Sequence, residues 1–234
     1  MPYDADLVLR GQSSGAYVDL DESDVAATAT AVNSDGNSVV DLGDGGGTGM
    51  DGLDVVVILH DAPTTYEDTC DIVIQDSDHL TDGWEALLSF PRIYALMREV
   101  IVTSTTAFLG TDIGLVFTAT TNGAVGVLRQ FSRKLLTPVG GTGKCWVSMV
   151  GAGDTYATDG DTVTCTAGTG IGTVVVPGRV IDPPYIVVRK LSTPKRYLRC
   201  SITVSAGGNF GDVDILLTGK QHSFVNNLLM TGGY

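Results

Sequence analysis

Residues 195–205, with the sequence KRYLRCSITVS, alternate between apolar and polar side chains. In an extended chain, successive side chains point to opposite faces of a sheet. The apolar members are Leu198, Cys200, Ile202 and Val204, and the polar members are Arg199, Ser201, Thr203 and Ser205. A strand with one buried and one solvated face is typical of antiparallel sheets, so this stretch predicts an antiparallel β protein.

The same alternation recurs along the chain between short turns that are rich in Gly, Asp and Asn, the residue types that turns favour. No long segment repeats with the helical period of 3.6 residues. Seven further strands are therefore expected, at Val25–Val32, Ser38–Leu42, Leu53–His60, Thr69–Gln75, Trp84–Phe90, Tyr185–Arg189 and Gly211–Thr218. Together with the first strand they predict an all-β fold, an eight-stranded antiparallel sandwich.

A stretch of different character interrupts this pattern. Residues 94–184 carry no net charge, are rich in Gly and Thr, and lie between Pro91 and the pair Pro183–Pro184. Six strands are expected within it, at Glu99–Ser104, Leu115–Thr120, Ala124–Arg129, Cys145–Val150, Asp161–Ala167 and Ile171–Val176. Because surface loops tolerate inserted domains, we expect residues 94–184 to form a second small β domain, and residues 1–93 plus 185–234 to form the sandwich. A single larger β domain is the alternative.

Charge is distributed unevenly along the 234 residues, whose net charge is −13. Residues 1–93 hold 19 acidic and 2 basic side chains, whereas residues 185–234 hold 2 acidic and 6 basic ones. The overall charge disfavours binding to nucleic acid or to an anionic membrane surface. No apolar run approaches the ~20 residues that a transmembrane helix needs, and the first residues do not resemble a secretory signal. The acidic and basic parts are expected to attract, within a chain or between chains; a merely solvated acidic surface is the alternative.

No arrangement of residues typical of an enzyme is found. The three histidines lack a metal-binding spacing, and Lys144 lies in a sequence that departs twice from the phosphate-loop motif. We therefore expect no enzymatic activity, no catalytic residues, no cofactor and no metal centre. The Gly- and Asp-rich segment 41–54 leaves one alternative open, because carboxylates are ligands for Ca²⁺; a plain hairpin loop is the other interpretation. Cys70, Cys145, Cys165 and Cys200 form no CxxC pair and are expected to be buried free thiols.

Several segments resemble the capsid cement (decoration) proteins of tailed double-stranded DNA phages. In the first part of the chain these are residues 29–43, with ATAV followed by NSVVDLG, and residues 53–57, with LDVVV. Near the end they are the alternating strand that begins with KRYLR at Lys195 and the turn GGNF at 207–210. Tyr3, Asp4 and Leu7 also fit the family's opening. The resemblance covers residues 1–93 and 185–218, and the inserted stretch departs from the short members of the family.

The resemblance implies a jelly-roll sandwich that assembles as a homotrimer on the outer surface of the capsid and clamps neighbouring major capsid proteins. The expected partners are therefore the phage major capsid protein and further copies of the chain, with no direct contact to nucleic acid or membrane. The last segment, residues 219–234, is apolar enough either to cover the chain's own core or to reach a neighbouring subunit. The candidate interface residues are Lys195, Arg196, Tyr197, Arg199, Phe224, Leu228, Leu229 and Met230.

Two other functions remain open from the sequence alone. One is a carbohydrate-binding β module, secreted or attached to a virion, that uses the inserted domain. Its candidate contact residues are the aromatic side chains of Phe131, Trp146 and Tyr156, although Trp146 is equally suited to a core. The other is an adhesin-like component of a virion tail.

Overall fold

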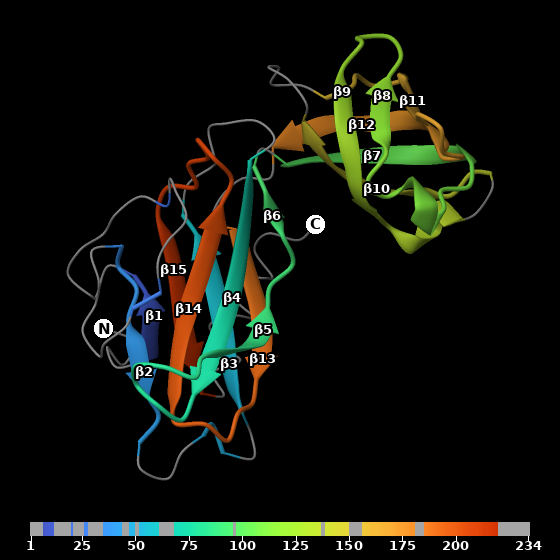
Figure 1. Cartoon of the computed structure of the whole chain (residues 1–234). Helices are drawn as coiled ribbons and strands as arrows, with labels where there is room; N and C mark the ends of the chain where they lie inside the picture. Colours follow the sequence, from blue (N-terminus) through green and yellow to red (C-terminus); the bar gives the residue numbers. More distant parts are fainter. Residues whose placement is uncertain are drawn as a thin grey trace. The chain divides into compact units, whose positions relative to one another are not determined.

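The computed structural model describes residues 7–11, 20, 26–27, 35–43, 47–49, 52–60, 68–95, 97–136, 139–149, 156–180 and 185–219. The described chain is all-β, and its paired strands are antiparallel (Figure 1). It divides into two compact units. Unit 1 comprises Met1–Pro63, Asp68–Ile93 and Pro183–Tyr234, and unit 2 comprises Thr64–Glu67 and Tyr94–Asp182.

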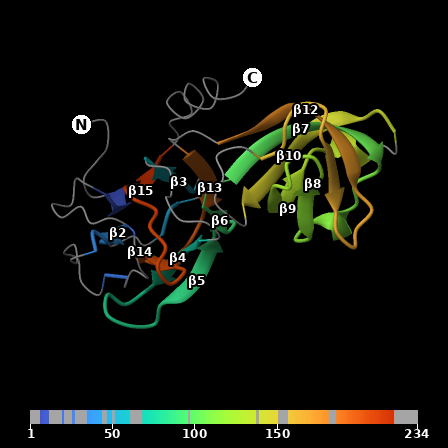
Figure 2. The same cartoon turned by 90° about the horizontal axis from the view of Figure 1, so that it is seen from above.

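Unit 1 contains two antiparallel sheets, seen as two layers in Figure 2. The first sheet has the order β1-β15-β3-β13, formed by Val8–Arg10, Val213–Thr218, Leu53–Leu59 and Tyr185–Leu191. The second has the order β2-β14-β4-β5, formed by Val39–Asp41, Tyr197–Val204, Thr69–Ser77 and Glu85–Ser89, and the short β6 (Ile93–Tyr94) also pairs with β4. We call these the first and the second sheet.

The core of unit 1 is built from the alternation in its strands. In β4 and β14 every second side chain is buried, and Ile72, Ile74 and Cys200 are at most 1% exposed. The thiol of Cys200 lies 3.6 Å from the carbonyl oxygen of Leu9 in β1, so the two sheets meet at this point. Burying an apolar side chain of this size contributes about 1.5–3 kcal/mol, which makes the alternation in β14 a main determinant of the sandwich.

Unit 2 is a closed antiparallel barrel with the strand order β10-β7-β12-β11-β8-β9. Its strands are β7 (Met97–Thr106), β8 (Val116–Ala119), β9 (Val125–Phe131), β10 (Thr142–Met149), β11 (Thr162–Cys165) and β12 (Ile171–Val180). Two short 3₁₀ helices, η3 (Gly110–Asp112) and η4 (Arg133–Leu136), connect them. Closure leaves no free sheet edge, and the interior is filled by aromatic and aliphatic side chains that include Phe108, Phe117 and Tyr156.

The strands expected from the sequence agree with this architecture except at one place. All six strands expected between residues 94 and 184 are present, as are seven of the eight expected elsewhere, with ends shifted by a few residues. The expected strand Val25–Val32 is not observed at Ala26 and Ala27, which are buried but lie outside any strand, and its other residues lie outside the described part. Two short strands of the two sheets were not expected, β1 and β6. The three residues of β1, all buried, are too few to show alternation. No helix in the described part of the chain is long and apolar enough to cross a membrane.

Candidate functional site

β14 places half of its side chains on the outer side of the second sheet. Leu198 and Cys200 point into the core, so the alternation directs Arg199 outward, where it lies opposite Gln75 of β4 in the strand register. Tyr197 is likewise half-buried, and it follows directly on Lys195 and Arg196. All four basic or aromatic residues expected at the interface near this strand are therefore within the described part of the chain.

Arg199 is held between two neighbours on this outer side. Its guanidinium carbon lies 4.2 Å from the centroid of the Trp84 ring, and its Nε donates a hydrogen bond of 2.8 Å to Oε1 of Gln75. Stacking of arginine on tryptophan is a favourable cation–π contact. Burial lowers the pKa of Arg199. The side chain is thus fixed in one position against the sheet.

Arg196 forms a two-pronged ion pair with Asp41 at the end of β2. Its Nε and Nη2 donate to the two carboxylate oxygens at 2.8 and 2.7 Å, and its guanidinium carbon lies 5.1 Å from the centre of the Tyr197 ring. The hydrogen bond from Arg196 lowers the pKa of Asp41 despite some opposing burial. Both partners are about one-third exposed, so the pair is a surface feature that orients Arg196 more than it stabilises the fold.

Lys195 joins two carboxylates of the acidic first part of the chain. Its Nζ lies 3.0 Å from Oδ1 of Asp76 and 2.6 Å from Oε2 of Glu85. The buried Asp76 also accepts a hydrogen bond of 2.5 Å from Oγ1 of Thr193. The hydrogen bond to Glu85, followed by that to Asp76, raises the pKa of Lys195. The charge distribution predicted attraction between acidic and basic parts, either within one chain or between chains. Lys195 and Arg196 both form ion pairs with acidic residues of the same chain.

Gly47 and Thr48, two described residues of the glycine-rich segment, lie against the turn before β14. The backbone N–H of Gly47 donates to the carbonyl of Lys195, and the N–H of Thr48 donates to the carbonyl of Thr193, each at 2.9 Å. Gly47 has a φ of +76°, and a Cβ there would lie 2.5 Å from the Thr193 oxygen, so only glycine fits. Asp41, one of the carboxylates considered for Ca²⁺, has both oxygens directed to Arg196.

The remaining carboxylates of that segment do not build a metal site in the described part of the chain. Asp44 and Asp51 lie outside the described residues, and Asp54 is in β3, paired with Lys190 and Thr218. No group of three or more His, Cys, Asp or Glu among the described residues has the arrangement of a metal site.

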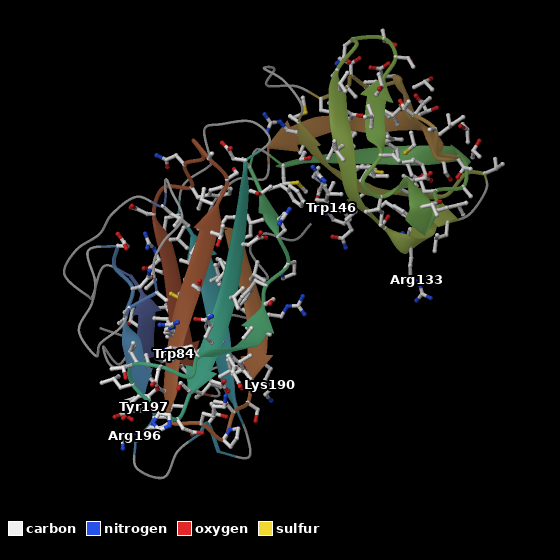
Figure 3. All side chains as sticks on the ribbon, in the orientation of Figure 1. Trp84, Arg133, Trp146, Lys190, Arg196 and Tyr197 are labelled. Atoms are coloured by element: carbon white, nitrogen blue, oxygen red, sulfur yellow. The ribbon has the colours of Figure 1, made fainter. Side chains whose placement is uncertain are left out.

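Together these residues form a surface that we call the β14 face, made of Gln75, Trp84, Arg196, Tyr197 and Arg199. Trp84 directly precedes Glu85, and Arg196 and Tyr197 directly precede Leu198. Glu85 and Leu198 both lie opposite Asp76, so all three lie toward the same end of the second sheet (Figure 3). Trp84 and Gln75 were not predicted as members, because Gln75 in β4 and Trp84 just before β5 are far from β14 in the sequence. The pairing of neighbouring strands could have indicated them. Gln75 points outward in the alternation of β4, and Trp84 begins the next expected strand.

The other candidate residues lie outside the described part of the chain or in the barrel. Phe224, Leu228, Leu229 and Met230 lie outside the described residues. Of the aromatic residues considered for carbohydrate binding, Tyr156 is fully buried in the barrel, where its hydroxyl donates to the carbonyl of Phe117 at 2.9 Å. Phe131 packs against the barrel core, and Trp146 is half-buried on β10. Tyr156 is therefore not available for stacking on a sugar, whereas Phe131 and Trp146 are both partly exposed.

The side chains of the β14 face are of the types found in protein–protein interfaces. Arginine, tryptophan and tyrosine are the side chains that most often dominate protein interfaces, and here they are held in place by contacts within the chain.

All four cysteines are free and buried, as expected. Burial raises the pKa of Cys165 to about 12, so this thiol remains protonated and unreactive at neutral pH.

Comparison with known proteins adds no relative. No protein-family model matches the sequence, and no curated protein and no solved structure matches it.

Proposed function

We propose that the chain is a capsid cement protein: a structural protein that binds the outer surface of a phage head as a homotrimer and stabilises contacts between major capsid proteins. The main support for the proposal is the agreement between the segments that resemble cement proteins and the division of the chain into two units. The segments that resemble cement proteins are interrupted by about ninety residues, yet both belong to unit 1, while the interruption coincides with unit 2. A cement protein with a domain inserted into it accounts for that division.

The strand pairing supports a jelly roll for unit 1. If β1 to β5 and β13 to β15 are counted as eight strands, the first pairs with the last, the second with the seventh, the third with the sixth and the fourth with the fifth. This nested pairing is what results when a long hairpin is folded over into two sheets, as in the jelly rolls of viral capsid proteins. The barrel is then inserted between the fifth and sixth strands, next to β6.

The β14 face is the proposed contact with the capsid. Lys195 and Arg196 are neutralised by Asp41, Asp76 and Glu85, so simple attraction to an acidic partner contributes little. Trp84, Tyr197 and Arg199 instead offer a rigid aromatic and cationic patch whose side chains need little further ordering on binding. In a trimer three such patches act together, and the effective affinity rises far above that of one contact.

Retention on purified heads that lack the protein tests this proposal. The variant Trp84→Ala with Arg199→Ala should bind at least about tenfold more weakly, because loss of a central aromatic or arginine residue commonly costs more than 1.4 kcal/mol. The control is Arg133→Ala with Lys134→Ala, which removes two exposed charges from η4 of unit 2 and should bind normally. Circular dichroism checks that both variants fold.

Two further measurements separate this function from the alternatives. Light scattering at micromolar concentration should give the mass of a trimer, and heads without the protein should release DNA at lower temperature than heads that carry it. A monomer that is not retained on heads would contradict the proposal, and a glycan-binding or tail-located β module would then replace it.

A further inference from the structure

One basic side chain of the β14 face is half-buried and has no acidic partner. Arg199 stacks on the ring of Trp84 and donates a hydrogen bond to the amide oxygen of Gln75, and both of these neighbours are uncharged. Among the described residues no carboxylate forms an ion pair with its guanidinium. The positive charge of Arg199 is therefore not neutralised by the described part of the chain.

Other basic residues of the second sheet are treated differently. Lys195, Arg196 and Arg92 each form an ion pair with a carboxylate of the same chain, at 2.6–3.0 Å. Acidic residues are abundant, 27 against 14 basic ones in the whole sequence. Opposite Arg199 in the strand register, however, lies Gln75, the uncharged counterpart of glutamate. The arginine is thus held in position by a neutral amide where a carboxylate of similar size would have neutralised it.

An unneutralised guanidinium is unfavourable at a half-buried position. Burial disfavours the charged form of a basic side chain, and it lowers the pKa of Arg199. The contacts with Trp84 and Gln75 offset part of this cost. A carboxylate that approaches from outside would offset more, because an arginine and a carboxylate form charge-assisted hydrogen bonds that are stronger than those to a neutral amide.

The guanidinium has donors left for such a group. An arginine side chain carries five N–H donors. In Arg199, Nε donates to Gln75 at 2.8 Å, and Nη1 lies 3.5 Å from the carbonyl oxygen of Ala27. Nη2 has no hydrogen-bond partner among the described residues, and it is not one of their fully buried unpartnered nitrogens. An acceptor can therefore reach this end of the guanidinium from solvent.

The surroundings of Arg199 favour a carboxylate side chain over a phosphate or sulfate group. A carboxylate brings one negative charge, whereas a phosphate brings up to two toward a chain whose net charge is −13. Tyr197 lies on the same side of β14, two residues away, and Trp84 lies beside the guanidinium. These rings offer apolar surface to the methylene groups of an aspartate or glutamate.

We propose that Arg199, stacked on Trp84, is the receptor for one aspartate or glutamate side chain of the partner protein. Gln75 determines this specificity, because it fixes Nε of Arg199 without neutralising the guanidinium. The identification of the partner as the major capsid protein rests on the proposed function. The carboxylate chemistry rests only on the contacts of Arg199.

Titration of the isolated full chain with acetate tests carboxylate binding without a capsid. The chain has two tryptophans, Trp84 and Trp146, so the NMR signal of one indole N–H reports on the site and the other is an internal control. When acetate replaces chloride at constant ionic strength, the Trp84 signal should move along a saturating curve and the Trp146 signal should hardly move. In Gln75→Glu the Trp84 signal should not respond, because the new carboxylate pairs with Arg199. Equal movement of both signals, or an unchanged response in Gln75→Glu, would overturn the proposal.

Retention on heads shows whether the partner uses the same chemistry. Gln75→Glu should weaken retention about tenfold, the scale on which loss of one central interface contact acts. Gln75→Met is the matched control, since it has a similar length but leaves Arg199 unneutralised, and it should be retained much better than Gln75→Glu. Equal losses from the two variants would overturn the proposal. If the wild-type chain is not retained on heads, the proposed function fails, and the acetate titration still decides whether Arg199 binds a carboxylate.

Discussion

The two units of this chain reach stability in different ways. Unit 2 closes its strands into a barrel, so every strand has two neighbours and the interior holds a continuous aromatic cluster. Unit 1 has two open sheets whose outermost strands include β13 and β5, and one sheet is apolar on both faces. Closure removes the free edges of unit 2, but all the exposed large apolar side chains among the described residues lie in this unit, with Val139 the most exposed at 75%.

The two units also differ in charge. The inserted domain is neutral, 6 acids against 6 bases in residues 94–184, and internally complete. The acidic sandwich carries the β14 face and the segments that resemble cement proteins. Under the proposed function, contact with the capsid belongs to unit 1, whose β14 face and family-like segments carry that proposal.

Removal of unit 2 is the strongest test of whether the two units fold independently. Replacement of Tyr94–Pro184 by a short Gly/Ser linker should leave a soluble β protein, because all strands of both sheets except the end of β6 are retained. The isolated residues 94–184 should also fold, since the barrel is closed. Calorimetry of the whole chain should show two transitions, and each fragment should reproduce one of them. Insolubility of both fragments would mean that the units share one core.

Removal of one core ring should affect only the barrel. Phe117 is fully buried, with its ring 6.0 Å from that of Phe108 and 5.9 Å from that of Tyr156. Phe117→Ala should destabilise unit 2 by about 3–5 kcal/mol, the usual cost of such a cavity. The same experiment with Ile72→Ala in unit 1 is the matched control and should lower the other transition. If either variant shifts both transitions equally, the units do not unfold independently.

The sequence predicted strands far better than it predicted what covers them. Alternation located β4, β14 and all six barrel strands, because half-buried strands carry a period of two. β3 was predicted as well, although its residues Val55–Leu59 are all buried. Alternation could not locate β1, where all three residues are buried. It also gave no indication that the strands of residues 94–184 close into a barrel, since closure needs pairings between strands far apart in the sequence, such as β7 with β12.

The candidate site was predicted in part for the same reason. Lys195 to Arg199 were recognised from one strand, but the partners that fix them come from β2, β4 and the residue before β5. Charge distribution did predict that basic residues near the end of the chain would meet acidic residues from its beginning. It did not predict which carboxylates they would meet, because that depends on register.

A buried carboxylate provides a smaller test within the barrel. Asp112 is 0% exposed and accepts hydrogen bonds from the backbone N–H groups of Leu109, Thr169 and Gly170 at 2.8–3.1 Å. Asp112→Ala should destabilise unit 2 by about 1–3 kcal/mol, because buried donors are left without an acceptor. Thermal unfolding measures this, with Asp159→Ala, an exposed acid of the same unit, as control. An unchanged barrel transition would contradict the role of Asp112 as the acceptor that joins these turns.

The smallest expected effect belongs to the ion pair on the β14 face. Arg196 lowers the pKa of Asp41 in the folded chain, so the pair contributes stability above the ordinary carboxyl pKa of ~4 and loses it as the pH falls through the lowered value. Arg196→Ala should therefore destabilise unit 1 by at most about 0.5 kcal/mol at pH 7, as is usual for exposed pairs, and by nothing measurable near pH 2. Denaturant unfolding at both pH values measures the difference, and Arg133→Ala in unit 2 is the control. A cost that persists undiminished at acid pH would mean that Arg196 stabilises the sandwich by packing on Tyr197, 5.1 Å away, and not through the charge of Asp41.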